Sequence, residues 1–149
     1  MKILATDLDR TLLPNGSWEG DSNATPLFNE LTVTNDVLVV YVTGRNLALT
    51  ENAIKQYGIR HPDILCSDVG TLIRKYVNGK WLFDDGWIAH VKKESPRWNP
   101  LAIKDAVADI DGIREQESEH QIRFKQSYYV EHDKKERVLM DIDELVKGN

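Results

Sequence analysis

The fold of this chain is decided by its N-terminal stretch, Lys2-Ile3-Leu4-Ala5-Thr6-Asp7-Leu8-Asp9-Arg10-Thr11. The nearly continuous apolar run predicts a strand over residues 3–6 that is buried on both faces. Two aspartates follow with one residue between them, so both carboxylates project to one side while Leu8 points to the other. Because the two charges repel, the pair needs a bound cation or a shared proton. We expect one aspartate to act as a nucleophile while its neighbour transfers a proton.

Further strands and helices alternate after this stretch. Thr25 as N-cap and Pro26 at the first helical position predict a short helix through about residue 31, and residues 37–42 form a second apolar strand. Asn46 or a neighbouring residue is expected to cap a helix that Gly58 ends, and residues 64–66 form a third strand. This β-α-β-α-β order predicts a parallel sheet with right-handed crossovers. Ligands bind such sheets at the carboxyl ends of the strands, where Asp7 and Thr43 lie.

Three segments carry a resemblance to a known family. The pattern Asp7-x-Asp9-x-Thr11 resembles the signature of the haloacid dehalogenase (HAD) superfamily of phosphohydrolases. Thr-Gly-Arg at residues 43–45 is similar to the second phosphate-binding motif of the branch that carries a large cap. Residues 61–73 resemble the P-D…S-x-V-G-T-x-I segment of sucrose-phosphate phosphatases. The resemblance implies an α/β fold whose core is a Rossmann-like parallel sheet, with residues 1–69 as the N-terminal part of that core.

Residues 70–149 correspond to a partial α+β cap in this resemblance. The turn signal Asn78-Gly79 predicts a hairpin over residues 71–83, followed by a helix from about residue 85 to 91. A helix over 102–108, a strand over 122–130 and a charged helix over 134–146 are expected next. In the family the chain then returns to the sheet with a catalytic lysine and a late acidic metal loop. Neither has a counterpart here, so we expect the sequence to be the N-terminal part of a longer enzyme.

The resemblance also assigns roles to individual residues. It implies that Asp7 attacks phosphorus to form an aspartyl-phosphate, and that Asp9 acts as general acid and base. Thr43 and Gly44 would bind the phosphoryl oxygens. Arg45 is either a further phosphate ligand or a solvated residue at a helix start. Magnesium is the implied cofactor, because carboxylate and carbonyl oxygens from Asp7 and Asp9 suit it.

Substrate recognition is assigned by the same resemblance to Asn46, Gln121, Lys125 and Ser127. Lys125 is equally well explained as an ordinary exposed lysine. Phe124 stands where sucrose-phosphate phosphatases usually carry a histidine. We therefore expect a small phosphorylated substrate, most simply a sugar phosphate, rather than sucrose phosphate in particular.

Composition limits the class of protein. The 149 residues are 41% hydrophobic and 29% charged, as in an ordinary globular domain. A formal net charge of −5 argues against nucleic acid as a partner. No apolar stretch reaches the length of a membrane span, which makes the cytoplasm the expected location. The single cysteine, Cys66, is expected to be a small core residue.

These observations predict a magnesium-dependent phosphomonoester hydrolase that works through an aspartyl-phosphate. One alternative is a sugar phosphomutase of the same superfamily, which shares the first motif. Another is a catalytically incomplete fragment that acts as a binding or oligomerising piece. A three-stranded half-sheet leaves an unpaired edge, so a homo-oligomer or a complementing C-terminal polypeptide is the expected macromolecular partner.

Overall fold

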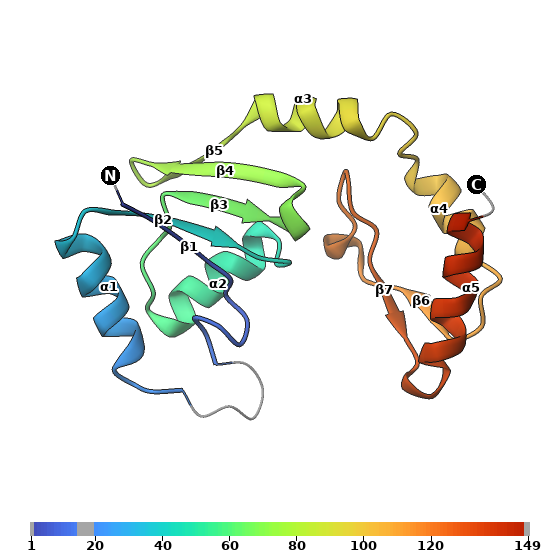
Figure 1. Ribbon diagram of the computed structural model, residues 1–149, viewed down its shortest axis with the longest axis horizontal. Helices are drawn as coiled ribbons and strands as arrows, with labels where there is room; N and C mark the ends of the chain where they lie inside the picture. Colours follow the sequence, from blue (N-terminus) through green and yellow to red (C-terminus); the bar gives the residue numbers. More distant parts are fainter. Residues whose placement is uncertain (1, 15–19, 148–149) are drawn as a thin grey trace. The chain divides into compact units, whose positions relative to one another are not determined.

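The computed structural model describes residues 2–14 and 20–147. They belong to two compact units, Met1–Glu94 and Ser95–Asn149, called unit 1 and unit 2 below (Figure 1). No helix within the described ranges is long and apolar enough to span a bilayer.

Unit 1 is built on one five-stranded sheet with the strands in sequence order, β1-β2-β3-β4-β5. The first three strands are parallel and the last two are antiparallel, so the predicted α/β core with parallel strands is confirmed. The strands are β1 (Lys2–Thr6), β2 (Val37–Val42), β3 (Ile64–Ser67), β4 (Leu72–Val77) and β5 (Lys80–Phe83), and the helices are α1 (Ala24–Thr34), α2 (Leu47–Tyr57) and α3 (Asp85–Glu94).

Local sequence signals explain where these elements begin and end. The Asn46 side chain accepts a hydrogen bond from the Leu49 amide and caps α2, while Gly58 ends the helix at φ +64°. Asn78 and Gly79 turn the β4–β5 hairpin with φ of +51° and +77°, the left-handed pair that a two-residue hairpin turn requires. The predicted N-cap at Asn46, the predicted helix end at Gly58 and the predicted hairpin turn at Asn78 and Gly79 are therefore confirmed.

The hydrophobic core lies on one face of the sheet, against α1 and α2. Its buried residues are Leu8, Leu13, Val39, Tyr41, Ala53, Ile54, Ile59 and Leu65. The Tyr41 hydroxyl donates to the Arg60 carbonyl at 2.8 Å, and burial raises the pKa of this tyrosine. Alternation along the strands sends the other side chains of β1, β2 and β3 to the second face of the sheet.

That second face explains why the prediction of a fully buried first strand is wrong. Ile3 on β1 and Val42 on β2 lie on it, and they are 60% and 45% exposed. Neither belongs to the core cluster. In the described residues β1 pairs with β2 alone, so it is an edge strand, and all of its residues except Thr6 are exposed.

The hairpin after β3 extends the core sheet, because β4 pairs with β3 from Ser67↔Leu72 to Ile64↔Lys75. Consequently the compact units divide between residues 94 and 95, not between 69 and 70. The division into residues 1–69 and 70–149 stays a prediction about where the family core ends and the cap begins.

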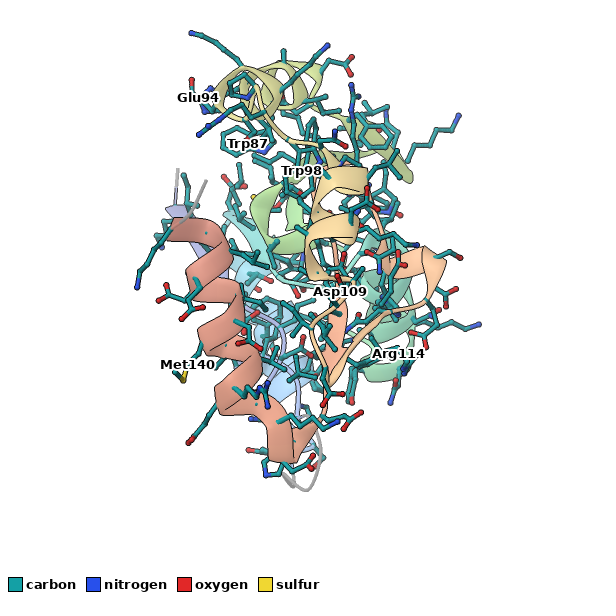
Figure 2. All side chains as sticks on the ribbon, turned by 90° about the vertical axis from the view of Figure 1, so that its right-hand side faces the viewer. Trp87, Glu94, Trp98, Asp109, Arg114 and Met140 are labelled. Carbon is teal, nitrogen blue, oxygen red and sulfur yellow. The ribbon has the colours of Figure 1, made fainter. Side chains whose placement is uncertain are left out.

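Unit 2 contains α4 (Pro100–Val107), β6 (Ile113–Glu115), β7 (Tyr128–Val130) and α5 (Lys135–Lys147). Strands β6 and β7 form an antiparallel pair. The strand expected over residues 122–130 is wrong for its first six residues, because Ile122 and Lys125 bond to each other in a tight turn at 3.1 Å. Met140 projects outward from α5 and is 65% exposed (Figure 2). Short 3₁₀ turns lie at Asp68–Gly70, Ser118–His120 and His132–Lys134.

Cys66 on β3 is half-buried and lies outside the core cluster, which corrects the expectation of a core residue. By alternation with Leu65 it faces the second side of the sheet. Burial nevertheless raises the pKa of its thiol.

A raised pKa leaves less of the reactive thiolate at neutral pH. We therefore expect iodoacetamide to modify Cys66 more slowly at pH 7.5 than it modifies N-acetylcysteine, with the rate still rising above pH 9. Intact-protein mass spectrometry follows the reaction. Modification of Cys66 as fast as that of N-acetylcysteine would contradict the raised pKa of its thiol.

Candidate active site

The first predicted site residues lie in the turn that follows β1. Leu8 and Leu13 are fully buried, and the amide of Leu13 donates to the carbonyl of Leu8 at 2.8 Å. Arg10, at φ +58°, reverses the chain between them. The two buried leucines therefore hold the turn against the core and leave Asp7 and Asp9 at the carboxyl end of β1.

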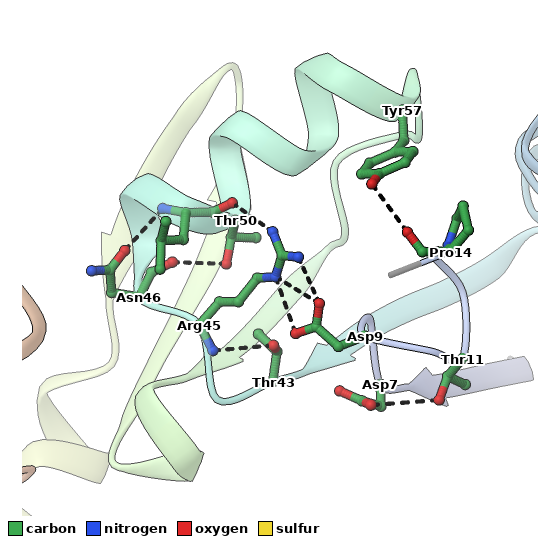
Figure 3. Close-up of polar contacts among 10 residues, drawn as sticks. Asp7, Asp9, Thr11, Pro14, Thr43, Arg45, Asn46, Thr50 and Tyr57 are labelled. Atoms are coloured by element: carbon green, nitrogen blue, oxygen red, sulfur yellow. Dashed lines mark hydrogen bonds and ion pairs between the residues drawn. The ribbon is translucent and has the colours of Figure 1, made fainter. Parts of the chain in front are cut away.

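Asp7 is exposed beside Thr11, whose hydroxyl donates to Asp7 Oδ2 at 3.4 Å (Figure 3). This contact ties the two ends of the Asp-x-Asp-x-Thr motif together within one turn. The position leaves the Asp7 carboxylate exposed, and its role as a nucleophile stays a prediction.

Asp9 is held by Arg45, which comes from the neighbouring strand connection. Arg45 Nε donates to Asp9 Oδ1 and Oδ2 at 3.0 and 3.1 Å, and Nη2 donates to Oδ1 at 2.6 Å. The hydrogen bonds to Asp9 raise the pKa of Arg45. Arg45 Nη1 also donates to the Leu49 carbonyl at 3.3 Å, so the first turn of α2 fixes the guanidinium (Figure 3). In the structure Arg45 therefore binds Asp9, and the contact of Arg45 with phosphate stays a prediction.

Thr43 and Gly44 form the loop between β2 and α2. Thr43 is 4% exposed, and its hydroxyl accepts a hydrogen bond from the Arg45 amide at 3.2 Å. The Thr43 amide donates to the Cys66 carbonyl at 2.9 Å, which continues the β2–β3 pairing into the loop. We call residues 43–45 the phosphate loop, after the prediction that they bind the phosphoryl group. Asn46, predicted to bind substrate, uses its side-chain oxygen to cap α2.

A buried charge pair next to this loop was missed by the sequence analysis. Asp68, Ser67 and Arg74 are 1%, 0% and 6% exposed. Ser67 Oγ donates to Asp68 Oδ2 at 2.7 Å and accepts from Arg74 Nη1 at 2.6 Å. Burial lowers the pKa of Arg74, and the nearby Asp68 opposes that shift. No pattern in the sequence signals this pair, because its members are brought together only by the β3–β4 pairing.

The backbone beside the pair is strained. Asp68, Val69 and Gly70 have φ of +57°, +56° and +84°. Such a conformation costs about 1–2 kcal/mol for each residue with a Cβ, and a β-branched residue is rarely found in it. Val69 is nevertheless 67% exposed, so burial of its side chain does not offset the cost.

The predicted substrate residues of the C-terminal half all lie in unit 2. The Gln121 side chain donates to the Gln116 and Ser127 carbonyls and accepts from the Ser127 amide at 2.8 Å. Ser127 Oγ donates to the His120 carbonyl at 3.3 Å. Lys125 lies in the turn with Ile122. Gln121 thus organises the backbone around Ser127, and the contact of these residues with substrate stays a prediction.

Metal ligands are few in the described part of the chain. No group of three or more His, Cys, Asp or Glu side chains there is arranged to hold a metal ion. Mg²⁺ takes one or two carboxylates and fills its shell with water and substrate phosphate. The exposed Asp7 carboxylate beside the turn fits that requirement.

The parallel core and the aspartate pair at the end of its first strand are those of hydrolases of the HAD superfamily. The chain belongs to the sucrose-6F-phosphate phosphohydrolase family, whose model matches residues 1–149. A HAD-like hydrolase of Nitrosococcus oceani is 35% identical over 127 residues, which cover 85% of this chain and 34% of the relative. Sucrose-phosphatase 2 of Nicotiana tabacum is 29% identical over 140 residues, covering 92% and 31%. The chain thus spans about a third of the length of these curated relatives.

Solved structures support the same fold. The sucrose-phosphatase of Synechocystis sp. PCC6803, solved with sucrose and phosphate, has a TM-score of 0.77 at 21% identity and covers 99% of this chain and 56% of its own. A HAD-like hydrolase of Bacillus subtilis has a TM-score of 0.56 at 17% identity, covering 97% and 55%. At these identities the likeness concerns the fold alone.

Proposed function

We propose that this chain carries the nucleophile, the acid–base group and the phosphate loop of a magnesium-dependent phosphomonoester hydrolase. The observation that carries the proposal is the joining of two motifs that are 36 residues apart: Arg45, after β2, holds Asp9, after β1, at 2.6 Å (Figure 3). β1 and β2 are adjacent and parallel, so these residues lie at the edge of the sheet where ligands bind.

The reaction has two steps. An Asp7 carboxylate oxygen attacks phosphorus, the bond from phosphorus to the sugar oxygen breaks, and Asp9 gives that oxygen a proton. Water then attacks the aspartyl-phosphate, Asp9 takes its proton, and orthophosphate leaves. Arg45 orients the Asp9 carboxyl group, which is protonated at the start of the first step and is a carboxylate at the start of the second. Thr43 and Gly44 position the phosphoryl oxygens, since positioning and charge neutralisation dominate phosphoryl transfer.

Magnesium would be held by the Asp7 carboxylate and the Asp9 backbone carbonyl. It would neutralise phosphate charge and so reduce repulsion between the substrate and Asp7. The chain alone supplies few ligands, so binding of Mg²⁺ and of phosphate should each strengthen the other.

The substrate class we propose is a sugar phosphate. Membership of the sucrose-6F-phosphate phosphohydrolase family supports it. The sugar would be recognised by residues of unit 2, Gln121, Lys125 and Ser127. We propose a cytoplasmic location, where charged sugar phosphates are retained.

A panel of phosphoesters with added Mg²⁺ tests the function. Hydrolysis releases orthophosphate from a hexose phosphate, and EDTA should stop it. Formation of an isomeric hexose phosphate without orthophosphate would favour the phosphomutase alternative instead.

The third alternative, an incomplete piece, is favoured by the apolar second face of the sheet. Ile3, Val42 and Leu82 lie on it and are 60%, 45% and 51% exposed. Large apolar side chains that stay exposed on one face of a sheet indicate an interaction surface. Because the relatives are about three times as long as the region matched, we propose that additional polypeptide from such a longer protein covers this face in the working enzyme.

In the chain alone, the same face is expected to drive self-association. Size-exclusion chromatography with light scattering should give a mass above that of the 17.1 kDa monomer. The double substitution Ile3→Lys and Val42→Lys should restore the monomer, because it places two charges on the exposed apolar face. Leu101→Lys, an exposed residue of unit 2, is the control and should change nothing. A wild-type monomer at 100 μM would contradict the expectation.

A further inference from the structure

The left-handed turn at residues 68–70 is bonded to the phosphate loop. The Asp68 amide donates to the Arg45 carbonyl at 2.9 Å, and the Val69 amide donates to the Thr43 carbonyl at 3.3 Å. Two successive amides of the turn thus hold the carbonyls at both ends of the loop. They can do so only because the turn is left-handed, which explains why the chain keeps an exposed valine at φ +56°.

Side chains hold the turn from its buried side. Asp68 Oδ2 accepts from Ser67 Oγ at 2.7 Å and lies 3.8 Å from Arg74 Nη1. Arg74 in turn lies over the Phe83 ring at 4.7 Å, so β5 fixes its position. The Gly70 carbonyl accepts from Trp87 Nε1 at 3.0 Å. The turn is therefore fastened to β3, β4 and α3.

The charge pair is poorly explained by stability alone. Buried ion pairs gain little over apolar residues of similar size, because both charges lose their water. Here Asp68 Oδ1 and Arg74 Nε also lack a hydrogen-bond partner within the described residues. A buried pair that is incompletely bonded, next to a strained turn, indicates a role in holding geometry.

We propose that Asp68 and Arg74, bridged by Ser67, are positioning residues for the phosphate loop. They fix the left-handed turn whose amides hold the Thr43 and Arg45 carbonyls, and so set both the loop and the guanidinium that orients Asp9. The inference rests on the proposed function for its ligand, a phosphoryl group, while the positioning itself is a property of the ligand-free chain.

The test compares Asp68→Asn with a matched control, Asp63→Asn. Asp63 also pairs with an arginine, Arg60, at 3.3 Å, and it accepts the Val39 amide, but it precedes β3 at the opposite edge of the sheet. Two quantities are measured on the whole chain: orthophosphate affinity with Mg²⁺ by calorimetry, and hydrogen exchange of the Asp68 and Val69 amides by NMR. Ser67→Ala, which breaks the bridge but keeps both charges, serves if Asp68→Asn does not fold.

We expect Asp68→Asn to weaken orthophosphate binding about tenfold and Ser67→Ala about threefold, as for the loss of one hydrogen bond or charge partner. Both should speed exchange at the Asp68 and Val69 amides. Asp63→Asn should lower the melting temperature without changing either quantity. Equal effects of Asp63→Asn and Asp68→Asn, or unchanged exchange in both site variants, would overturn the proposal. Failure of the wild-type chain to bind orthophosphate refutes the proposed function instead, and the exchange rates still decide the positioning role.

Discussion

Replacement of Asp7 by asparagine is expected to abolish hydrolysis of a hexose phosphate, with a loss on the order of 10⁴-fold or more in kcat. The amide cannot attack phosphorus, so the covalent step is lost while the shape of the turn is kept. Because Asp7 is exposed and its one described side-chain bond, to Thr11, is long at 3.4 Å, the melting temperature should barely change. Orthophosphate release with saturating Mg²⁺ measures the effect.

The control for Asp7→Asn is Asp36→Asn, which makes the same chemical change at an exposed aspartate between α1 and β2. Asparagine tolerates the φ of +51° found there, so activity should stay at the wild-type level. Substantial turnover by Asp7→Asn would rule out Asp7 as the nucleophile. The assay is run on the chain and on any longer product of its gene, because relatives of this family are longer.

Replacement of Asp9 by asparagine should lower kcat by roughly 10²–10⁴-fold, the usual contribution of a general acid or base. The variant also leaves Arg45 without its ionic partner. The Asp9 and Arg45 side chains are 35% and 20% exposed, and pairs near the surface are worth only about 0–1 kcal/mol. An increase of several kcal/mol in the activation barrier, together with a small loss of stability, would therefore mark a role in the reaction.

Arg45→Lys separates orientation from charge. Lysine keeps the positive charge but cannot reproduce the two-nitrogen contact with Asp9, so kcat should fall while KM changes little. A large rise in KM at constant kcat would instead indicate that Arg45 binds the phosphate of the substrate. The result therefore decides whether Arg45 orients Asp9 or binds the phosphate.

Much of unit 1 could be predicted because its signals are local. Asn46 and Gly58 bound α2 as their side-chain chemistry requires, and Asn78-Gly79 closes the hairpin. The exposure of β1 could not be predicted from local sequence signals. A continuous apolar run shows that a strand can be covered on both faces, but the covering elements lie elsewhere in the chain or outside it.

The candidate site likewise contains some residues that local sequence signals predicted and others that they did not. Asp7, Asp9 and Thr43 follow strands in a recognisable motif, so their common edge was predictable. The Asp68–Arg74 pair could not be predicted, because it depends on the strand register Ser67↔Leu72 and on a left-handed turn. Valine is rarely found in such a turn, so Val69 gives no signal for it. In unit 2, β6 and β7 have three residues each, too few to show alternation, and the side-chain bonds of Gln121 shape residues 116–127 instead.

The most direct measurement is the location of the phosphoryl group during turnover. The chain is incubated with a phosphoester and Mg²⁺, quenched in acid and digested, and the peptides are analysed by mass spectrometry. The account predicts a phosphoryl group on Asp7 that is absent in Asp7→Asn and still formed in Asp9→Asn. Phosphate release without a phosphorylated Asp7, or a phosphoryl group on another residue, would contradict it.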